Sequence, residues 1–471
     1  MIIGASAFFH DASISVVNNN KILFASGSER FSKIKNDKYL CPELITHLSQ
    51  YEPSRVVYYE NPVMKKLRQI YSFQLSDIFL NPKHILKNMF HVNNIETCSH
   101  HESHAALAFH TSPYKTAAIM VIDAIGEFET ITIWQGSPTG IVKLKSYYYP
   151  NSIGLLYSAF AKRLGLIPNK EEYIMMGMAG YGRPVYFEHI MNDFIVSSKN
   201  VHKGISDVYL KGCKKEDIAC SVNEVARFCV MEIAREALKL TGEKNLCYGG
   251  GVALNCSVNS SLFDVFENVH INSNPGDAGS SLGCILAKTN KKINFTPYLG
   301  YNIRANIDPR EVAQSILRNK AVGIAHGRAE FGPRALGNRS ILADASSIKT
   351  KKIVNNIKGR EQFRPLAPVV MQEYAEQYFE CHNRQYPYMQ FTVAAKDKAL
   401  IPAAVHVDNT CRLQTVNYKQ NPLLYSILYE YNKLTGIPVL INTSLNIKNR
   451  PLLNDYMDKQ KFSSKYSLKV F

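Results

Sequence analysis

The sequence predicts an α/β fold in two domains, and three observations lead to this expectation. The chain has 471 residues, which is longer than one ordinary domain, and 46% of them are hydrophobic, enough for a large core. Short apolar strands recur along it, each followed by a turn and then by a strand or a helix. A polar stretch at 289–309 contains Pro297, Gly300 and Pro309 and is typical of a linker. We therefore expect domains at 1–300 and 305–471.

The first domain begins with a predicted hairpin. Residues 2–7 and 13–17 alternate like strands, residues 18–20 form the turn, and 21–25 form a third strand. From residue 117 a similar strand–turn–strand pattern recurs, with a buried strand, a turn at Gly126 and a strand rich in Thr and Ile. The segment 245–263, NLCYGGGVALNCSVNSSLF, predicts a strand that passes through glycines into a helix. Such duplicated units are typical of actin-like, ribonuclease-H-like folds with a nucleotide cleft between two halves.

The second domain is predicted from shorter signals. Residues 321–327 and the stretch GIPVLINTSLN at 436–446 read as buried strands, and 347–360 reads as a helix. The final residues, 449–471, are polar and rich in Lys and Ser. We expect much of this tail to lack regular structure, as in a domain shortened at its C-terminus.

The charge is basic and unevenly distributed. The formal net charge is +16; residues 1–300 hold 30 basic and 26 acidic residues, whereas 301–471 hold 25 and 13. Phosphorylated small molecules and nucleic acid both suit such a surface, as does plain solubility. The ten cysteines form no C-x-x-C pair, which favours free thiols in a reducing compartment. With no signal peptide and no membrane-spanning run, we expect a cytoplasmic protein.

Three histidines crowd the stretch CSHHESHAA at 98–106. Ser99 and Glu102 form a capping-box pattern, so a helix is predicted to start here. On that helix His100 and His104 share one face, as in two-histidine metal motifs, whereas His101 points elsewhere. Histidines on the surface of a helix explain the same pattern equally well.

Two acids are candidates for the remaining ligands. Asp123 follows a buried strand at a glycine turn, and Asp277 lies in the loop NPGDAGSSLG. Two His and two Asp suit a divalent iron, manganese or zinc ion. Turn or capping chemistry accounts for either acid taken alone.

Glycines and basic residues indicate phosphate binding. Backbone groups in glycine turns, together with one Asn, are candidates to bind a nucleotide: Gly126, Gly249, Gly250, Gly251 and Asn255. For the glycines at 249–251 a tight turn is the simpler interpretation. In the second domain, basic residues between glycines and two polar residues after a strand suit a polyphosphate: Arg328, Arg334, Arg339, Lys358, Arg360, Arg364, Ser444 and Asn446. Surface salt bridges are the alternative.

The chain resembles the NodU/CmcH family of O-carbamoyltransferases. The matching stretches run in order from residue 2 to about 451 and include GASAFFHDASISVV, HHESHAALAF, LCYGGGVALNCSVN, GDAGSSLG, GRAEFGPRALGNRSILAD, IKGREQFRPLAP and TGIPVLINTSLN. The resemblance implies an actin-like first domain similar to Kae1/TsaD and a second domain similar to YrdC/Sua5. The K-x-R and S-x-N signature of the latter falls on Lys358, Arg360, Ser444 and Asn446.

The resemblance also implies a reaction. The second domain would form carbamoyl-adenylate from carbamoyl phosphate and ATP with Mg²⁺, and the first would transfer the carbamoyl group to a hydroxyl of a sugar or antibiotic-like molecule. His100, His104, Asp123 and Asp277 would hold a divalent metal, Fe²⁺ ahead of Mn²⁺ or Zn²⁺, and His10 would be the general base. Neither a membrane nor nucleic acid is expected as a partner, and a homodimer is compatible with the sequence. The alternatives are a tRNA threonylcarbamoyl transferase-like enzyme and a nucleotide-binding relic.

Overall fold

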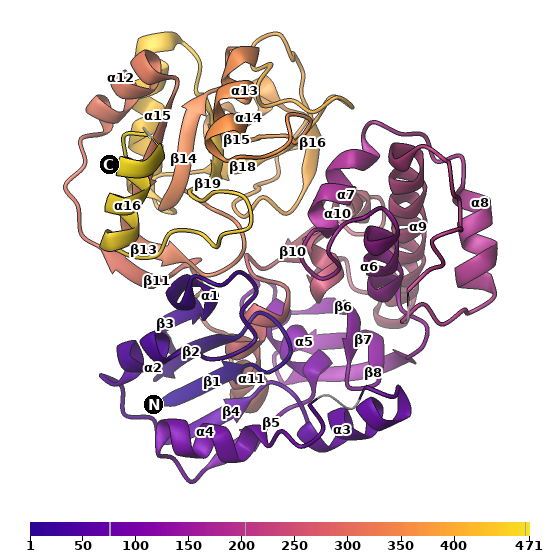
Figure 1. Cartoon of the computed structure of the whole chain (residues 1–471). Coiled ribbons are helices and arrows are strands. Elements are labelled where there is room, and N and C mark those ends of the chain that lie inside the picture. The colour runs from indigo at the N-terminus through magenta and orange to yellow at the C-terminus, as the bar shows by residue number, and fades with distance from the viewer. Residues whose placement is uncertain (75–76, 203, 467) are drawn as a thin grey trace. The chain divides into compact units, whose positions relative to one another are not determined.

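The chain folds into two compact units. The computed structural model describes residues 1–74, 77–202, 204–466 and 468–471. Unit 1 comprises Met1–Ser32 and Asn36–Phe295, and unit 2 comprises Lys33–Lys35 and Thr296–Phe471 (Figure 1). The division expected from the sequence, at 300–305, lies a few residues further along.

Unit 1 contains two five-stranded sheets. Their strands are β1 (Ile2–Ser6), β2 (Ser13–Asn18), β3 (Lys21–Gly27), β4 (Arg55–Tyr58), β5 (Ile95–Thr97), β6 (Ala117–Gly126), β7 (Glu129–Ser137), β8 (Gly140–Tyr148), β9 (Asn245–Gly249) and β10 (Asn268–Ile271). The α-helices are α1 (Glu29–Ser32), α2 (Pro42–Leu48), α3 (Pro62–Tyr71), α4 (Pro82–Phe90), α5 (His100–His110), α6 (Ile153–Arg163), α7 (Glu172–Ala179), α8 (Phe187–Ile190), α9 (Lys215–Thr241), α10 (Cys256–Asn259) and α11 (Ser280–Thr289). A π-helical segment covers Met191–Val196, and short 3-10 turns cover Gly251–Leu254, Ser260–Asp264 and Asp277–Gly279.

The two sheets share one topology. The first has the order β3-β2-β1-β4-β5, and the second has β8-β7-β6-β9-β10. In each sheet the first three strands in sequence are antiparallel neighbours, and the last two run parallel to the central strand. The hairpin and the repeat predicted from the sequence are therefore confirmed as a duplicated unit.

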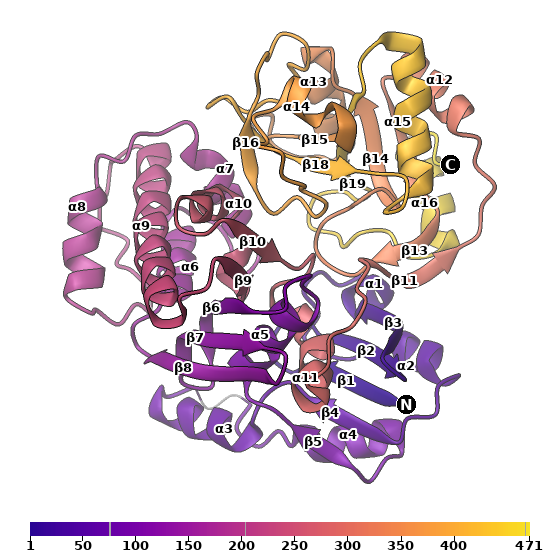
Figure 2. The same ribbon diagram turned by 180° about the vertical axis from the view of Figure 1, so that it is seen from behind.

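Helices α5 and α11 pack against each other between the two sheets (Figure 2). Helix α11 also lies on β1, and α5 lies on β6 and β9. The approach is close at Gly4, where a Cβ atom would fall 1.7 Å from the carbonyl oxygen of Ser281. A residue without a side chain is needed there, because β1 and α11 touch backbone to backbone.

Unit 2 is built on a second type of sheet, with the order β12-β14-β19-β15-β18. Neighbours are antiparallel except β15 and β18, which are parallel. The strands of unit 2 are β11 (Tyr298–Ile303), β12 (Ala321–Ala325), β13 (Gly327–Glu330), β14 (Arg339–Asp344), β15 (Ala367–Met371), β16 (Thr392–Ala394), β17 (Thr410–Arg412), β18 (Gln414–Val416) and β19 (Val439–Ser444). Its helices are α12 (Pro309–Asn319), α13 (Ile348–Ile357), α14 (Ala375–Tyr378), α15 (Pro422–Thr435) and α16 (Tyr456–Tyr466), with a 3-10 turn at Gln372–Tyr374.

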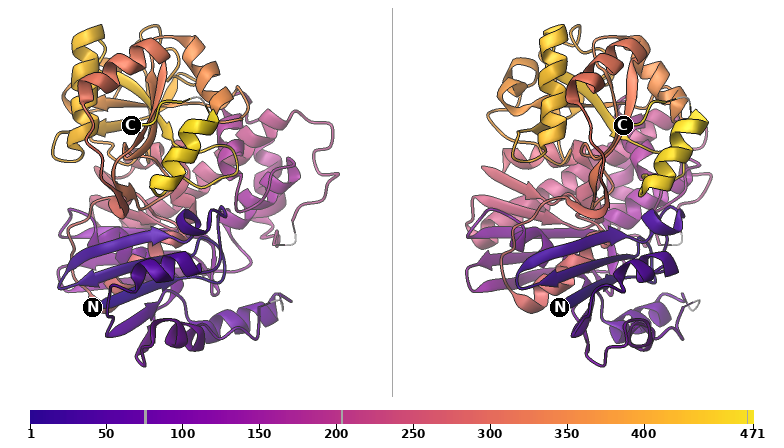
Figure 3. Two further views of the ribbon diagram at one scale, coloured as in Figure 1. Left: turned by 60° about the vertical axis from the view of Figure 1, so that its left-hand side comes forward. Right: turned by 90° about the vertical axis from the view of Figure 1, so that its left-hand side faces the viewer.

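Helices α12 and α15 lie side by side along this sheet (Figure 3). Their inward side chains, among them Ile316 and Ile427, are fully buried against Val322 and Leu440 of the strands. This apolar layer is the core of unit 2, and it holds the ends of β14 and β19 in place.

Two expectations about irregular segments are wrong. The proposed linker at 289–309 contains strand β11, which pairs with β13. The polar tail contains α16, and Val470 forms a parallel bridge with Gly323. The tail is ordered because Phe462 and Leu468 are buried, although the sequence around them is mostly polar.

The helix predicted after the glycines at 249–251 is shorter than expected, because a 3-10 turn precedes the single helical turn α10. In the described part of the chain, no helix is long and apolar enough to cross a bilayer.

Candidate functional site: four converging ligands in unit 1

Helix α5 begins where the sequence predicts. Ser99 caps it by accepting a hydrogen bond from the backbone N–H of Glu102, and the Glu102 carboxylate accepts one from the Ser99 N–H. This capping box is confirmed, and it places His100 in the first turn with His104 one turn later. Both side chains are buried, as is His101, whose Nδ1 lies 3.0 Å from Thr132 Oγ1. These histidines are therefore not on a solvent-exposed helix face.

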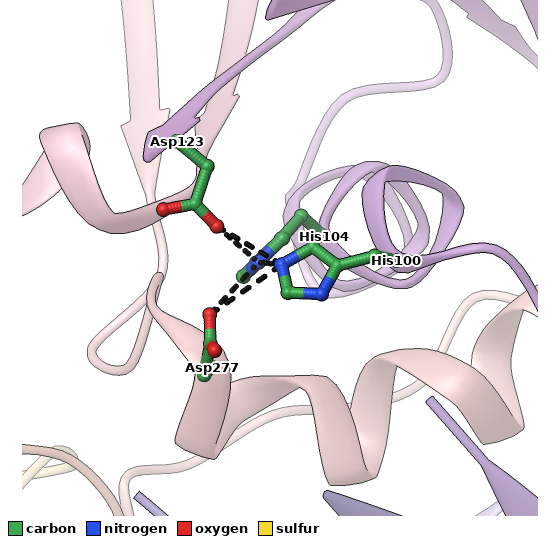
Figure 4. Close-up of side chains that lie close together, drawn as sticks. All are labelled: His100, His104, Asp123 and Asp277. Atoms are coloured by element: carbon green, nitrogen blue, oxygen red, sulfur yellow. Dashed lines mark hydrogen bonds and ion pairs between the residues drawn. The ribbon is translucent and has the colours of Figure 1, made fainter. Parts of the chain in front are cut away.

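Four side chains converge at the start of α5 (Figure 4). His100 and His104 meet Asp123 of β6 and Asp277 of the loop before α11, and one atom from each lies within 4.8 Å of the other three. Asp123 lies where the β6–β7 pairing becomes irregular, after Ile122, so its side chain leaves the strand ladder. All four residues are buried.

The geometry of the four atoms fits a metal ion. His100 Nε2 lies 3.0 Å from Asp123 Oδ2 and 3.5 Å from Asp277 Oδ1, and His104 Nε2 lies 3.3 and 3.5 Å from the same atoms. Ligands about 2.1 Å from a common ion are separated by roughly 3.0–3.4 Å. The two Nε2 atoms are 3.1 Å apart, and two nitrogen lone pairs facing each other gain nothing unless a proton or a cation lies between them. The residues present thus fit a divalent cation with nitrogen and oxygen ligands.

His10 lies at the edge of this cluster. It lies in the bend between β1 and β2. Its Nε2 is 3.5 Å from Asp277 Oδ2, and its Nδ1 is 3.0 Å from Asp11 Oδ2. Burial lowers the pKa of His10, but the charges of Asp277 and Asp11 outweigh this and raise it to about 9. Burial likewise opposes ionisation of Asp277, but the imidazoles of His10 and His100 hold its pKa below the usual range.

Glu127 is a site residue that the sequence did not single out. Its carboxylate accepts hydrogen bonds from the backbone N–H of His100, at 3.2 Å, and from that of Asn61, at 2.7 Å. Burial raises the pKa of Glu127 to about 7, although these hydrogen bonds oppose the shift. Glu102 already fills the capping-box position at the start of α5. Glu127 follows Gly126 far away in the sequence, and no motif there indicates that it contacts this helix.

The predicted nucleotide-binding glycines lie around the four ligands and leave room for them. A Cβ atom on Gly126 would fall 2.5 Å from the ring of His100, and one on Gly249 would fall 3.1 Å from the His104 carbonyl oxygen. Gly250 has a φ of +92° and lies against the backbone of Ile122. The N–H of Gly251 donates to Asp123 Oδ1 at 3.1 Å. Local packing accounts for all four glycines.

Asn255, the remaining predicted nucleotide ligand, caps the short helix α10. Its side chain accepts from the Val258 N–H and donates to Asn223 Oδ1 at 3.0 Å. It therefore belongs to a polar network between α9 and α10.

In unit 2 the structure brings Lys358, Ser444 and Asn446 together. The Lys358 ammonium donates to Ser444 Oγ at 3.0 Å and to Asn446 Oδ1 at 2.7 Å, and also to the carbonyl oxygens of both residues. Burial, together with the charges of Arg360 and Arg364, holds the pKa of Lys358 well below its ordinary value. A buried ammonium beside two guanidinium groups is a site that a phosphate would stabilise.

The other basic residues of unit 2 have mixed roles. Arg360 donates to Asn355 Oδ1 at 2.6 Å, and Arg364 pairs with Glu361 at 3.7 Å. Arg328 donates to the carbonyl oxygen of Leu299 at 2.6 Å, and Arg334 lies half-buried in the loop before β14.

Arg339, which the sequence grouped with the anion-binding arginines, has a structural role instead. Its side chain is fully buried and donates to backbone carbonyl oxygens of His326, Gly327, Asn338, Tyr301 and Asn454. All these acceptors are supplied by the fold, so this guanidinium is part of the framework that joins β11, β13 and the C-terminal segment.

Comparisons with known proteins show the family of the chain. Residues 53–286 match the family described as Carbamoyltransferase N-terminus, and residues 313–471 match Carbamoyltransferase C-terminus. Nodulation protein NolO of Bradyrhizobium diazoefficiens is 32% identical over 76% of this chain and 75% of its own length. Nodulation protein NolNO of Sinorhizobium fredii is 29% identical over 96% of this chain and 76% of its own.

A solved structure, HypF of T. kodakarensis, is also similar. It aligns over 61% of this chain and 47% of its own, with 13% identity and a TM-score of 0.35. A likeness at this level supports no conclusion about the activity of this chain.

Proposed function

Because the chain belongs to the carbamoyltransferase family, we propose that it is an ATP-dependent O-carbamoyltransferase acting on a hydroxyl of a small molecule. The observation that carries the proposal is the convergence of His100, His104, Asp123 and Asp277 with His10 beside them. A cation held by the four buried ligands and a histidine at their edge would together suit acyl transfer from a mixed carbamoyl–phosphate anhydride, because the cation offsets charge on the phosphate and the histidine can take a proton.

The first half-reaction is proposed for unit 2, read as a YrdC-like domain. Carbamoyl phosphate, ATP and one water give carbamoyl-adenylate, pyrophosphate and inorganic phosphate. Lys358 and Arg360 would hold the phosphates, while Ser444 and Asn446 position the Lys358 ammonium through the hydrogen bonds described above. The low pKa of Lys358 favours this use, because a phosphate supplies the negative charge that its surroundings lack.

The second half-reaction is proposed for unit 1, read as an actin-like domain. The acceptor oxygen attacks the carbamoyl carbon, the new C–O bond forms, and the bond from that carbon to the phosphate oxygen of AMP breaks. His10 accepts the hydroxyl proton at Nε2. A divalent metal at the four ligands, with Fe²⁺ ahead of Mn²⁺ and Zn²⁺, would supply a positive charge for the phosphate of the leaving group.

With its pKa raised to about 9, His10 is protonated at neutral pH, so its role as a base requires that this pKa fall. Asp277 is the main group that raises its pKa, and compensation of the Asp277 charge by a bound cation would remove that cause. Glu127 holds the N-terminal turn of α5 in position through the His100 N–H, so it acts on the ligands through the backbone.

Pyrophosphate release tests the first half-reaction. The whole chain, purified without a chelator, is incubated with ATP and carbamoyl phosphate. We expect release that depends on both substrates, and no release from metal-loaded protein would refute the adenylate-forming half.

A variant at His10 tests the division of labour. We expect His10→Ala to lower carbamoyl transfer about 100-fold or more while pyrophosphate release continues. Transfer is measured by mass spectrometry as the gain of one carbamoyl group across a panel of hydroxyl compounds. Loss of both activities would contradict the assignment of the two steps to two units. His84→Ala, which removes an exposed histidine of α4, is the matched control and should change neither.

A further inference from the structure

Helix α3 has its polar residues inside and its apolar residues outside. Lys65, Arg68 and Gln69 are only 8, 2 and 7% exposed. On the other side of the helix, Val63 and Ile70 are 65 and 52% exposed. Ordinary surface helices have the opposite polarity, because burying charged groups and exposing apolar ones both cost free energy. An inward polar face therefore requires something polar to contact.

What lies against this face is a cavity of about 390 Å³ in unit 1, large enough for a small ligand. Helix α3 can be located in Figure 1. The cavity is lined by Phe8, Phe9, Lys65, Arg68, Gln69, Phe73, Gln74 and Asp77. Aromatic rings with amide and cationic groups are a typical lining for a polar organic molecule such as a sugar.

The cationic groups of the cavity are not all paired within the protein. Lys65 pairs with Glu60 at 2.7 Å, and Asp77 pairs with Lys38 at 3.9 Å. Arg68 donates through Nη1 to Gln74, but among the described residues its buried Nε has no hydrogen-bond partner. Across that part of the chain no carboxylate forms an ion pair with Arg68, and the residues outside it, at 75, 76, 203 and 467, are Leu, Ser, Lys and Ser. The charge of Glu60 acts on Arg68, but Glu60 pairs directly with Lys65, so no counter-charge is in contact with Arg68.

The cavity lies one aromatic ring away from the proposed general base. Phe9 belongs to its lining, and the rings of Phe9 and His10 have centroids 4.8 Å apart. Lys65, which also lines the cavity, has its Nζ 5.2 Å from the centroid of the Phe9 ring. A molecule that fills the space would therefore lie between Arg68 and the ring that contacts His10.

We propose that this cavity binds the acceptor, and that the acceptor is an anionic hydroxyl compound whose carboxylate, phosphate or sulfate group pairs with Arg68. The pairing supplies the missing counter-charge, and guanidinium binds such groups with two parallel hydrogen bonds. The aromatic rings of Phe9 and Phe73 would cover the apolar faces of the molecule. This inference rests on the proposed carbamoyl transfer and adds the chemical class of its acceptor.

Calorimetry on the whole chain with matched sugars tests the proposal. The probes are glucuronate and glucose 6-phosphate as acids, glucose as the neutral partner and glucosamine as the cation. We expect at least one acid to bind more than ten times more tightly than glucose, and glucosamine to bind no better than glucose. Absence of such a preference, including absence of any binding by either acid, would overturn the proposal.

Variants of Arg68 separate this site from others. Arg68→Met should bring the affinity for the acid down to that for glucose, and Arg68→Lys should retain part of the difference. Arg235→Met removes an exposed arginine of α9 and should behave like the unchanged protein. If Arg68→Met is unstable, the comparison of sugar affinities between Arg68→Lys and the unchanged protein still tests the proposal. A preference for acids that survives in Arg68→Met would overturn the assignment to Arg68.

Two further measurements identify the occupant. AMP is the competitor: if Arg68→Met weakens AMP binding and leaves the binding of the acids unchanged, the cavity belongs to the nucleotide and the proposal fails. Pyrophosphate release should be the same in Arg235→Met and the unchanged protein. Failure of that assay in both would refute the proposed adenylate step, whereas the sugar affinities would still decide the nature of the cavity.

Discussion

The Nε2 atoms of His100 and His104 lie 3.1 Å apart on one buried face of α5. Neither nitrogen is turned to solvent, and both face the same carboxylate oxygen, Asp123 Oδ2. Two nitrogen atoms this close favour a cation between them. Metal content is therefore the most direct test of the site.

We expect protein purified without a chelator or an affinity column for metals to contain about one divalent ion per chain. His104→Ala should lose it, since one of only four protein ligands is removed. Elemental analysis by mass spectrometry measures the content. In a thermal melt, added metal at about 100 times its Kd should stabilise the unchanged protein by roughly 2.7 kcal/mol and the variant by much less. Equal metal content in both proteins would contradict the assignment, and His84→Ala serves as the control.

Gly126→Ala should disturb the same site without removing a ligand. The new methyl group would lie 2.5 Å from the His100 ring, so the ring or β6 must shift. We expect a loss of about 1–3 kcal/mol in the free energy of unfolding and a clear loss of bound metal. Gly27→Ala is the matched control, because a Cβ there meets its nearest atom at an ordinary 3.7 Å. Urea unfolding and elemental analysis of both variants measure the two effects. If Gly126→Ala behaves like Gly27→Ala, the close packing of Gly126 against His100 does not matter for the site.

Lys358→Met should abolish pyrophosphate release in unit 2. The change removes the hydrogen bonds that the Lys358 ammonium donates to Ser444 and Asn446, and it removes the charge proposed to hold phosphate. We expect a fall of at least 100-fold. Lys352→Ala removes an exposed lysine of α13, the helix that ends just before Lys358, and should have no effect. Release that persists in Lys358→Met would exclude this lysine from the reaction, and metal content should be unchanged in every case.

The same lysine predicts a pH dependence of stability. Its pKa is lowered in the folded protein, so between that lowered value and the ordinary value near 10.5 the unfolded chain binds more protons than the folded one. The Lys358 contribution to the free energy of unfolding therefore rises as pH increases through this window. We expect the unchanged protein to gain stability relative to Lys358→Met in urea titrations from pH 7 to pH 10. A constant or falling difference would show that the ammonium is not destabilised by folding.

Local patterns in the sequence predicted much of unit 1. The alternation at 2–25 and the strands from residue 117 appear as β1–β3 and β6–β7, because each pairs with a neighbour only a short turn away. The capping box at Ser99 and the spacing of His100 and His104 are properties of one helix, and the structure has both. Short-range hydrogen bonding and helical periodicity suffice for such features.

Other features depend on contacts between distant segments, and the sequence misjudged them. The polar tail is ordered because the fold buries Phe462 and Leu468, and β11 exists because β13 lies beside it. Arg339 looks like an anion ligand until its backbone acceptors are known. Burial and pairing of this kind cannot be read from residue type.

The sequence by itself therefore determined which side chains have the chemistry for the site, namely two histidines one helical turn apart and two acids near glycines. Only the tertiary structure decided that Asp123 and Asp277 meet those histidines, because duplicated sheets bring the ends of β6 and the loop before α11 to the start of α5. It also decided the orientation of α3. The same pattern of polar and apolar residues permits either face to be buried, and only packing places Arg68 inside.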